Sequence, residues 1–278
     1  QYLSGVTPNP CVHCNRQLKF ELLPLRLHQL GVDVDCFATG HYATIDHDPV
    51  RSRYLLRRGR DSKKDQSYFL YQLTQPILAR TLLPLGSYHK NEVRGLARRY
   101  GLPVAEKSES QDFVSGGYPA LFGDHHAPGP IVNRKGDVLG EHSGIHRFTI
   151  GQRRGLRVAL GVPMYVTEIC PESNTVVIGP EEHLYRSELA AGSCNWIAFD
   201  RLEEPLLVTA RIRHRHKGSE AWVEPLADDR VAVRFDTPQS AITPGQAVVF
   251  YDGDIVVGGG LILPFVEAAQ VGTPRAQT

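Results

Sequence analysis

Hydrophobic positions in the first hundred residues alternate between helical and strand spacing. The leucines within residues 18–30 fall on one face of a predicted helix that ends at Gly31, and Pro24 should kink or break that helix. A short apolar run at 35–40 predicts a buried strand, and apolar residues at helical spacing in 93–100 predict a second helix. This order of helix, strand and helix predicts an open α/β sheet.

The pattern changes after about residue 112, where glycine and proline are frequent and helical spacing is lost. From Tyr165 onward, short β-branched runs separated by turns are typical of a small barrel or sandwich. We therefore predict an α/β fold followed by two β-rich modules, the last of which is a small β-barrel. The predicted domains cover residues 1–112, 113–193 and 194–278, with strand signals at 176–178, 206–208, 231–233, 247–250 and 255–257.

Composition indicates a compartment and limits the kind of partner. The 278 residues include 31 Lys and Arg against 30 Asp and Glu, so any nucleic-acid surface must come from local clusters of charge. Five scattered cysteines fit a reducing cytosol better than a disulfide scaffold. The sequence shows neither a signal peptide nor an apolar run of about 18 residues, so we predict a cytoplasmic protein with no membrane partner.

A pair of cysteines lies near the N-terminus, in the segment Thr-Pro-Asn-Pro-Cys-Val-His-Cys-Asn at residues 7–15. Pro8 and Pro10 favour extended backbone, which predicts that Cys11 and Cys14 lie on a stiff turn just before a helix. Backbone amides and the helix dipole at such a place lower the pKa of a thiol and favour a nucleophilic thiolate. A lone Cys-x-x-Cys pair is also compatible with zinc or iron–sulfur ligands, or with a buried structural pair.

Two further segments place polar side chains beside predicted strands. Thr39-Gly40-His41 ends the first strand, at the edge where open α/β sheets bind ligands, although a lone histidine is also typical of an ordinary surface. In residues 63–71, the lysines suit phosphates and Asp65 and Gln66 suit the edge of a base. Phe69-Leu70 should fill the core.

Two basic segments follow in the β-rich part. Residues 144–156 mix arginine, glycine and aromatic residues, and Arg153 and Arg154 suit an RNA backbone unless this is only a solvated hairpin. In residues 211–217 the cations alternate, so they would share one face of a strand. Such a ridge alone is usually a solvated face, but a second basic segment beside it favours a polyanionic partner.

Several motifs occur in one order along the chain. These include Thr-Pro-Asn-Pro-x-x-x-Cys-Asn, Ala-Thr-Gly-His-Tyr, Lys-Asp-Gln-Ser-Tyr-Phe-Leu, Gly-Leu-Pro-Val-Ala-x-Lys-x-x-Ser and Thr-Ile-Gly-Gln-Arg-Arg-Gly-Leu. Val-Arg-Phe-Asp-x-Pro-x-x-Ala-Ile-Thr-Pro-Gly-Gln-Ala-Val-Val-Phe-Tyr and a closing Gly-Gly-Gly follow them. From about Tyr2 to Ile262 the chain therefore resembles the bacterial tRNA-specific 2-thiouridylases, the MnmA/TrmU family.

The resemblance implies a reaction and its site residues. The C2 oxygen of the wobble uridine in tRNA would be adenylated with ATP and Mg, and sulfur from a donor protein or from sulfide would then displace AMP. It implies Cys14, together with Cys11, as catalytic, Gly40 as an ATP contact, and tRNA rather than DNA as the nucleic acid. The implied tRNA contacts are Asn9, Pro10, Cys11, His41, Lys64, Asp65, Gln66, Arg213, His214 and Gln246, to which the basic segment adds Arg153 and Arg154.

The sequence departs from the family pattern in three places. Residues 1–112 resemble the second half of an ATP-pyrophosphatase domain, and its Ser-Gly-Gly-x-Asp-Ser phosphate loop is expected in a segment before Gln1, so this chain alone should not turn over ATP. Cys11 stands where many members have Asp, which adds an iron–sulfur cluster as an alternative. The persulfide cysteine is absent from 110–115. Sulfur delivery would therefore use Cys11 with Cys14, a cluster, or a free sulfur donor.

The main competing interpretation is a non-catalytic tRNA- or RNA-binding protein that has lost ATP-dependent chemistry. A methyltransferase is disfavoured because no Gly-rich S-adenosylmethionine loop follows a strand. A zinc-dependent base deaminase is disfavoured because His13 beside Cys14 lacks the required ligand spacing.

Overall fold

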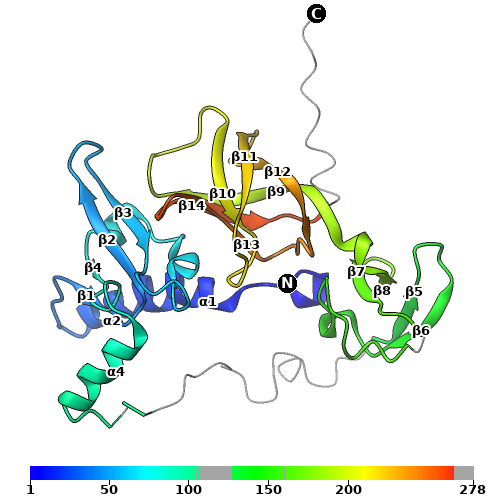
Figure 1. The fold of residues 1–278 in the computed structure, drawn as a ribbon, viewed down its shortest axis with the longest axis horizontal. Helices are drawn as coiled ribbons and strands as arrows, with labels where there is room; N and C mark the ends of the chain where they lie inside the picture. The colour runs from blue at the N-terminus through cyan, green and yellow to red at the C-terminus, as the bar shows by residue number, and fades with distance from the viewer. Residues whose placement is uncertain (104, 107–126, 159–160, 266–278) are drawn as a thin grey trace, which may run out of the picture.

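Three parts lie side by side in the computed structural model, which describes residues 1–103, 105–106, 127–158 and 161–265 (Figure 1). An α/β part stands at the left, a closed β-barrel in the centre and a small four-stranded module at the right. The N-terminal segment runs beneath the barrel from the small module to the α/β part. The predicted fold class, α/β followed by two β-rich modules ending in a barrel, is confirmed.

The first helix of the α/β part is continuous and consists of α1 (Pro10–His13), the π-helical segment η2 (Cys14–Leu22) and α2 (Leu23–Gln29). At the end of η2, the N–H of Leu23 donates to the carbonyl of Leu18, five residues back. Pro24 stands in the first turn of α2, where its missing N–H is tolerated. Of the two predicted outcomes at Pro24, a break is wrong, because the helix changes type there and continues to Gln29 before a left-handed Gly31, while a kink stays a prediction.

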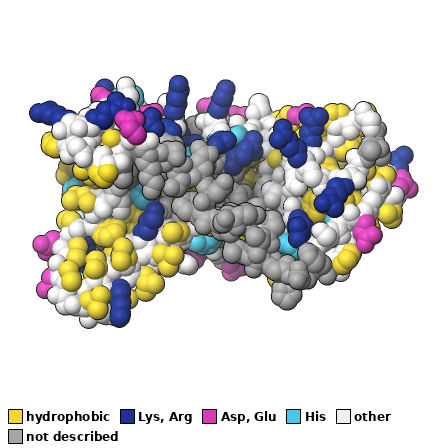
Figure 2. All heavy atoms as spheres, turned by 90° about the horizontal axis from the view of Figure 1, so that it is seen from below, with side chains coloured by type: hydrophobic (Ala, Val, Ile, Leu, Met, Phe, Trp, Pro, Cys, Tyr) yellow, Lys and Arg dark blue, Asp and Glu magenta, His cyan; other side chains and the backbone are white. Residues whose placement is uncertain are grey.

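The leucines whose spacing predicted this helix do not pack in the described structure. Leu18, Leu22, Leu25 and Leu30 are exposed, while Phe20 between them is buried. Figure 2 shows hydrophobic side chains gathered on the surface of the α/β part, at the left of the view. The spacing thus predicted the helix correctly, but it did not identify the face that packs against the described core.

The rest of the α/β part contains β1 (Phe37–Ala38), β2 (Ala43–Asp48), β3 (Arg53–Arg58), η3 (Ser67–Leu70), α3 (Gln75–Leu78), β4 (Thr81–Leu82) and α4 (Lys90–Arg99). β1 pairs with β4 in parallel and is shorter than the strand predicted at 35–40. α4 confirms the predicted second helix and begins with a capping box between His89 and Glu92. The β2–β3 hairpin was not predicted, because polar residues follow one another in Asp46-His47-Asp48 and hide the alternation.

The small module at the right of Figure 1 has its own hydrophobic core, centred on Ile131, Val166 and Ile178. Its strands are ordered β6-β5-β8-β7. Its elements, with the short N-terminal turn η1, are η1 (Tyr2–Ser4), β5 (Gly129–Val132), β6 (Val138–His142), η5 (Ile145–Arg147), β7 (Tyr165–Cys170), β8 (Thr175–Gly179) and η6 (Glu181–Leu184).

The barrel consists of β9 (Tyr185–Trp196), β10 (Leu206–Arg211), β11 (Ser219–Pro225), β12 (Val231–Ser240), β13 (Ala247–Asp252) and β14 (Ile255–Ile262). The strand order β13-β10-β11-β12-β9-β14 is closed by pairing of β13 with β14, so the barrel leaves no free edge. All five predicted strand signals fall in strands. β9 pairs with β12 and β14 along its length, so residues 185–193 share the barrel sheet with the residues after them.

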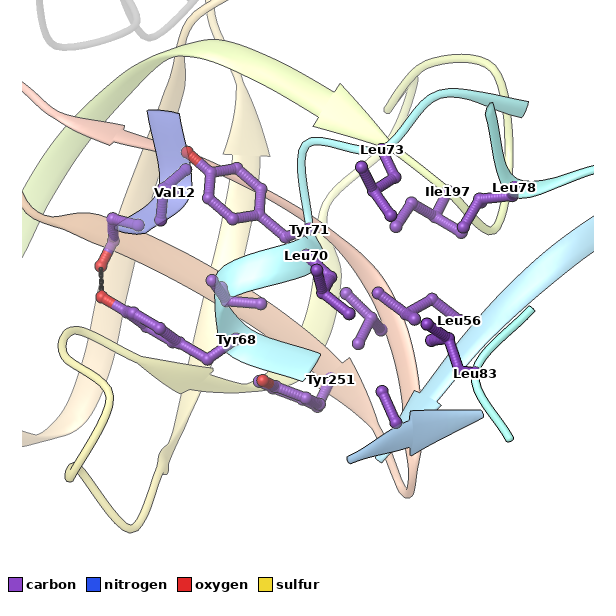
Figure 3. Close-up of a cluster of buried hydrophobic side chains, with 14 of the residues drawn as sticks. Val12, Leu56, Tyr68, Leu70, Tyr71, Leu73, Leu78, Leu83, Ile197 and Tyr251 are labelled. Carbon is purple, nitrogen blue, oxygen red and sulfur yellow. Dashed lines mark hydrogen bonds between the residues drawn. The ribbon is translucent and has the colours of Figure 1, made fainter. Parts of the chain in front are cut away.

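A second hydrophobic core joins the α/β part to the outside of the barrel (Figure 3). On β13, alternate residues face in opposite directions: Val248 and Phe250 fill the barrel, while Val249 and Tyr251 pack against the α/β part. The Tyr68 hydroxyl donates to the carbonyl of Ala247 at 2.8 Å, so a polar group in this core is satisfied. The α/β part and the barrel therefore share buried surface along β13.

A glycine on β14 makes this contact possible. A Cβ on Gly259 would lie 2.8 Å from Cδ2 of Tyr71 and 2.6 Å from the carbonyl oxygen of Val248. Only a residue without a side chain lets the Tyr71 ring lie this close to the barrel wall.

A buried ion pair crosses the same boundary. Nη1 of Arg211 lies 3.1 Å from Oδ2 of Asp65, and the two side chains are 11% and 4% exposed. The other carboxylate oxygen of Asp65 accepts the N–H groups of Gly59 and Ser67. Because each charge is paired and hydrogen-bonded, removing one partner would leave the other buried without compensation.

We therefore expect Asp65→Ala to lower the free energy of unfolding by about 3–5 kcal/mol. The control is Glu203→Ala, which breaks the exposed Arg201–Glu203 pair and should change it by less than about 1 kcal/mol. Urea unfolding of both variants measures the difference. Equal, small losses in the two variants would contradict a structural role for the buried pair.

Candidate active site

The two thiols of the N-terminal motif lie within a helix rather than before it. Asn9 is the N-cap, Pro10 opens α1, Cys11 follows in the first turn and Cys14 begins η2. Both cysteines are half-buried and reduced. Residues three positions apart in a helix lie on the same side, so the two thiols are neighbours.

The expectation of a lowered thiol pKa is wrong for Cys11. Burial raises the pKa of the Cys11 thiol above its ordinary value, and the neighbouring Cys14 raises it further, while Lys19 acts in the opposite direction. Desolvation disfavours a thiolate more than the short helix start favours it. Cys11 is therefore held mainly as a thiol near neutral pH.

His41 links the thiol helix to the end of β1 through a buried chain of hydrogen bonds. Its Nε2 lies 3.1 Å from Oδ1 of Asn15, and its Nδ1 lies 2.7 Å from the hydroxyl of Thr39. The amide nitrogen of Asn15 in turn donates to the carbonyl of Phe69. These partners are all satisfied when Nε2 carries the proton and Nδ1 accepts, so the imidazole is neutral. Burial lowers the pKa of His41 to about 4, and Lys19 contributes in the same direction.

The implied ATP contact, Gly40, lies beside His41 at the carboxyl end of β1 and is exposed. A Cβ at this position would lie 3.4 Å from Cδ1 of Leu85, an ordinary contact distance. The glycine leaves an open surface at the edge of the parallel pair, where ligands bind in open α/β sheets. This position fits a nucleotide contact.

The polar triplet after β3 lies close to the same strand end. Gln66 accepts the N–H of Tyr42 through its side chain and donates its own N–H to the carbonyl of Tyr42. Asp65 is buried in the ion pair described above, and Lys64 is half-buried. Only part of this triplet is therefore open to a ligand.

The barrel holds the segment that precedes the thiols. The amide of Gln246 donates to the carbonyls of Thr7 and Pro8, at 2.9 and 3.3 Å. Asn9 is buried and its side chain hydrogen-bonds the hydroxyl of Tyr68. Gln246 thus fixes the approach to α1 from the barrel side.

The basic segment after β10 is a loop and not the predicted strand, so its cations do not share one strand face. β10 ends at Arg211, whose guanidinium donates to the carbonyls of His214 and His216 as well as to Asp65. The centroids of the His214 and Phe69 rings lie 4.4 Å apart, and burial lowers the pKa of the His214 imidazole. Arg213 is exposed and donates to the carbonyl of Ser240.

Arg153 and Arg154 are exposed in the small module, on a turn shaped by the side chain of Gln152. The turn begins at Thr149, whose hydroxyl lies 3.3 Å from that of Thr7. The structure therefore connects the segments at 7–15, 39–41, 64–69, 211–216 and 246 through direct contacts, whereas the two arginines are joined to them only through the turn.

Sequence reasoning missed Asn15 and Tyr68 as parts of this site, and it interpreted Arg211 as part of a basic ridge rather than as the partner of Asp65. Asn15 follows Cys14 and Tyr68 follows the polar triplet in the sequence. Nothing in their spacing indicates that Asn15 holds His41 or that Tyr68 holds Asn9. The stretch at 110–115, where the family's persulfide cysteine was sought, lies outside the described residues.

Within the described ranges, no group of three or more Cys, His, Asp and Glu side chains is arranged to hold a metal ion. Cys11 and Cys14 alone supply two thiolates, fewer than an iron–sulfur cluster requires. In the same part of the chain, no helix is long and apolar enough to cross a membrane.

Comparisons with known proteins cover all three parts. Family models described as the tRNA methyl transferase HUP domain, the tRNA methyl transferase PRC-barrel domain and the aminomethyltransferase beta-barrel domain match residues 1–115, 123–180 and 186–262. A relative from Moorella thermoacetica is 52% identical over 268 residues, which are 94% of this chain and 74% of the relative. The chain belongs to the tRNA-specific 2-thiouridylase family.

Other relatives agree. Proteins from Halothermothrix orenii and Acetivibrio thermocellus are 47% and 49% identical, and each match covers 94% of this chain and 74% of the relative. All three relatives carry the name tRNA-specific 2-thiouridylase MnmA, in contrast to the methyltransferase wording of the domain descriptions. Membership in this family, with its HUP domain, implies the use of ATP.

Because the pKa of His41 is lowered on folding, protonating this imidazole must oppose folding. The folded protein loses stability as the pH falls from 6.5 toward 4, and none is lost above that range. We expect His41→Gln to remove about 2 kcal/mol of the stability difference between pH 7 and pH 5. Urea unfolding at both pH values measures it, and the same pH dependence in wild type and variant would contradict a buried neutral His41.

Proposed function

We propose that this protein is a sulfurtransferase that converts the wobble uridine of tRNA to 2-thiouridine in an ATP-dependent reaction. The observation that carries the proposal is identity of 47–52% to three tRNA-specific 2-thiouridylases over 94% of the chain. This match includes the thiol segment, the His41 strand end and the barrel residues that hold them. A non-catalytic RNA-binding protein would have no need to keep the dithiol helix in place.

We assign the chemistry to Cys14 and Cys11. The C2 oxygen of the uridine would attack the α-phosphate of ATP and release pyrophosphate, a step that Mg²⁺ would assist, so that C2 carries AMP as a leaving group. Gly40 lies where it would contact the nucleotide. A sulfur-donor protein loads Cys14 as a persulfide, whose terminal sulfur attacks C2 and expels AMP. The Cys11 thiolate then attacks the Cys14 sulfur, which releases 2-thiouridine and leaves a Cys11–Cys14 disulfide for a thiol reductant to reopen.

The raised pKa of Cys11 supports this division of roles. A thiol held protonated does not compete with Cys14 for the donor's sulfur, and its thiolate is strongly nucleophilic once formed. Sulfide attacking C2 directly is an alternative in which neither thiol carries sulfur. An iron–sulfur cluster would need further ligands beyond these two thiols, and we derive no step through it.

The implied tRNA contacts divide by exposure. We propose that Arg153, Arg154 and Arg213, whose side chains are exposed, contact the RNA backbone. We propose that His41 and Gln246, which are committed to hydrogen bonds within the protein, act as positioning residues for the thiol segment. For the remaining members of the implied set, the tRNA contact stays a prediction. These members are Asn9, Pro10, Cys11, Lys64, Asp65, Gln66 and His214.

The domain division and the compartment are also proposals. Pairing of β9 with β12 favours a last domain that begins near Tyr185, after an α/β domain and a central RNA-contacting domain. Reduced, scattered cysteines favour the cytoplasm.

In a full-length protein that includes the expected phosphate-loop segment, Cys14→Ser should reduce 2-thiouridine formation by at least about 1,000-fold, because a hydroxyl cannot carry a persulfide. The affinity for tRNA should remain unchanged. Quantification of 2-thiouridine in digested tRNA measures the first quantity, and filter binding measures the second. The matched control is Cys36→Ser, which removes an exposed thiol outside the site and should thiolate as wild type does. Wild-type thiolation by Cys14→Ser would remove Cys14 from the mechanism.

Cys11→Ser tests the second step. If Cys11 resolves the intermediate, the variant should accumulate a covalent protein–tRNA adduct through Cys14 that dithiothreitol releases. Denaturing gels with and without the reductant detect it. Full turnover without an adduct would instead support direct attack by sulfide, and loss of bound iron in anaerobically purified variant would support a cluster.

A further inference from the structure

The helix that carries the thiols changes its hydrogen-bond pattern after Cys14. The N–H of Cys14 donates to carbonyls three and four residues back, whereas the N–H of Leu23 donates to the carbonyl of Leu18, five residues back. The segment between these two points, η2, is a π-helix of nine residues. π-helical turns are rare and occur frequently at functional sites. The two buried side chains of η2 give this wide turn a physical reason.

Both buried side chains of η2 contact His41. Asn15 and Phe20 are 4% and 5% exposed. Nε2 of His41 lies 3.1 Å from Oδ1 of Asn15, and the centroids of the Phe20 and His41 rings lie 5.9 Å apart. In an α-helix, side chains five positions apart would point about 140° away from each other. In a π-helix they lie roughly one above the other, so this register lets both side chains reach one imidazole.

The Asn15 amide is anchored on two other elements. Its Oδ1 faces His41 at the end of β1, and its Nδ2 donates to the carbonyl of Phe69 in η3 at 3.4 Å. Two anchors on different elements keep η2 from rotating about its own axis. Because Cys14 directly precedes Asn15, the direction of the thiol is fixed relative to the end of β1, where Gly40 lies.

We propose that Asn15 is a positioning residue for sulfur transfer, which acts through His41 to hold η2 in its π register and to aim the Cys14 thiol at the adenylated C2 of the uridine. Because Asn15 is buried, we assign it no contact with tRNA or ATP. A reacting group must be held within about 0.5 Å of its productive position, and the packing around it has to supply that precision. The inference rests on the proposed function, since the thiol that Asn15 aims is the one assigned there to carry sulfur.

The test compares Asn15→Ala with Asn195→Ala in a full-length protein that includes the expected phosphate-loop segment. Asn195 is the matched control, because its amide on β9 also clamps two segments, through the carbonyls of Tyr71 and Leu73. Single-turnover thiolation at saturating tRNA and ATP should slow by roughly 100-fold in Asn15→Ala, the loss expected for a small misplacement of a reacting group. The tRNA affinity should stay unchanged, and Asn195→Ala should thiolate at the wild-type rate.

Asn15→Asp separates positioning from folding. This variant keeps an acceptor for Nε2 of His41, but it places a buried carboxylate beside the carbonyl of Phe69, which costs stability. Positioning through His41 therefore predicts that Asn15→Asp thiolates at least about 10-fold faster than Asn15→Ala, while urea unfolding finds it no more stable. A purely structural role predicts no such recovery, so equal or slower thiolation by Asn15→Asp would overturn the proposal.

A double-mutant cycle tests the route through His41. In an enzyme that already carries His41→Ala, Asn15→Ala should slow thiolation by less than about 2-fold further, because the two changes remove the same interaction. Independent losses that multiply would contradict this route.

Failure of the inference and failure of the proposed function give different results. If the wild-type protein forms no 2-thiouridine, the proposed function fails and the inference fails with it. If the wild type forms 2-thiouridine and Asn15→Ala is as fast as Asn195→Ala, the function stands and the positioning role of Asn15 is overturned.

Discussion

The rest of the structure depends on the packing of Tyr68 and Tyr71 against β13 and β14 of the barrel (Figure 3). Both aromatic rings are fully buried, and the glycine at 259 lets Tyr71 approach the barrel wall. Burial of two such side chains contributes several kcal/mol and holds two parts of the chain in one arrangement. This contact, together with the buried Asp65–Arg211 pair, fixes the loop at 61–66 relative to the loop at 212–217.

The polar interactions of the site follow from that contact. Once Tyr68 is in place, its hydroxyl bridges Asn9 and β13, and the adjacent carbonyl of Phe69 receives Asn15. The thiol helix is therefore held from the α/β side, while Gln246 holds its approach from the barrel. Each hydrogen bond is modest in net energy, but the unsatisfied alternative in a buried site is costly, so the arrangement is well defined.

Several residues that a sequence indicates as ligand contacts act inside the protein. Asp65 is committed to Arg211 and His41 to Thr39 and Asn15, so both side chains hold segments of the protein together. Conversely, Arg58 carries no motif signal, yet it lines a pocket between the loops after β3 and β10. A motif shows which residue type stands at a position. It does not show whether that side chain contacts a ligand or holds another part of the protein in place.

The sequence by itself determined the fold class, four of the six strands of the barrel and the thiol motif, because side-chain periodicity and proline chemistry act over a few neighbouring residues. Its motifs also indicated the family. Tertiary structure alone decided which leucines of the first helix are exposed, that the cations at 211–217 lie on a loop, and that burial raises rather than lowers the pKa of Cys11. These outcomes depend on desolvation and on partners more than a hundred residues away, and local spacing carries no information about either.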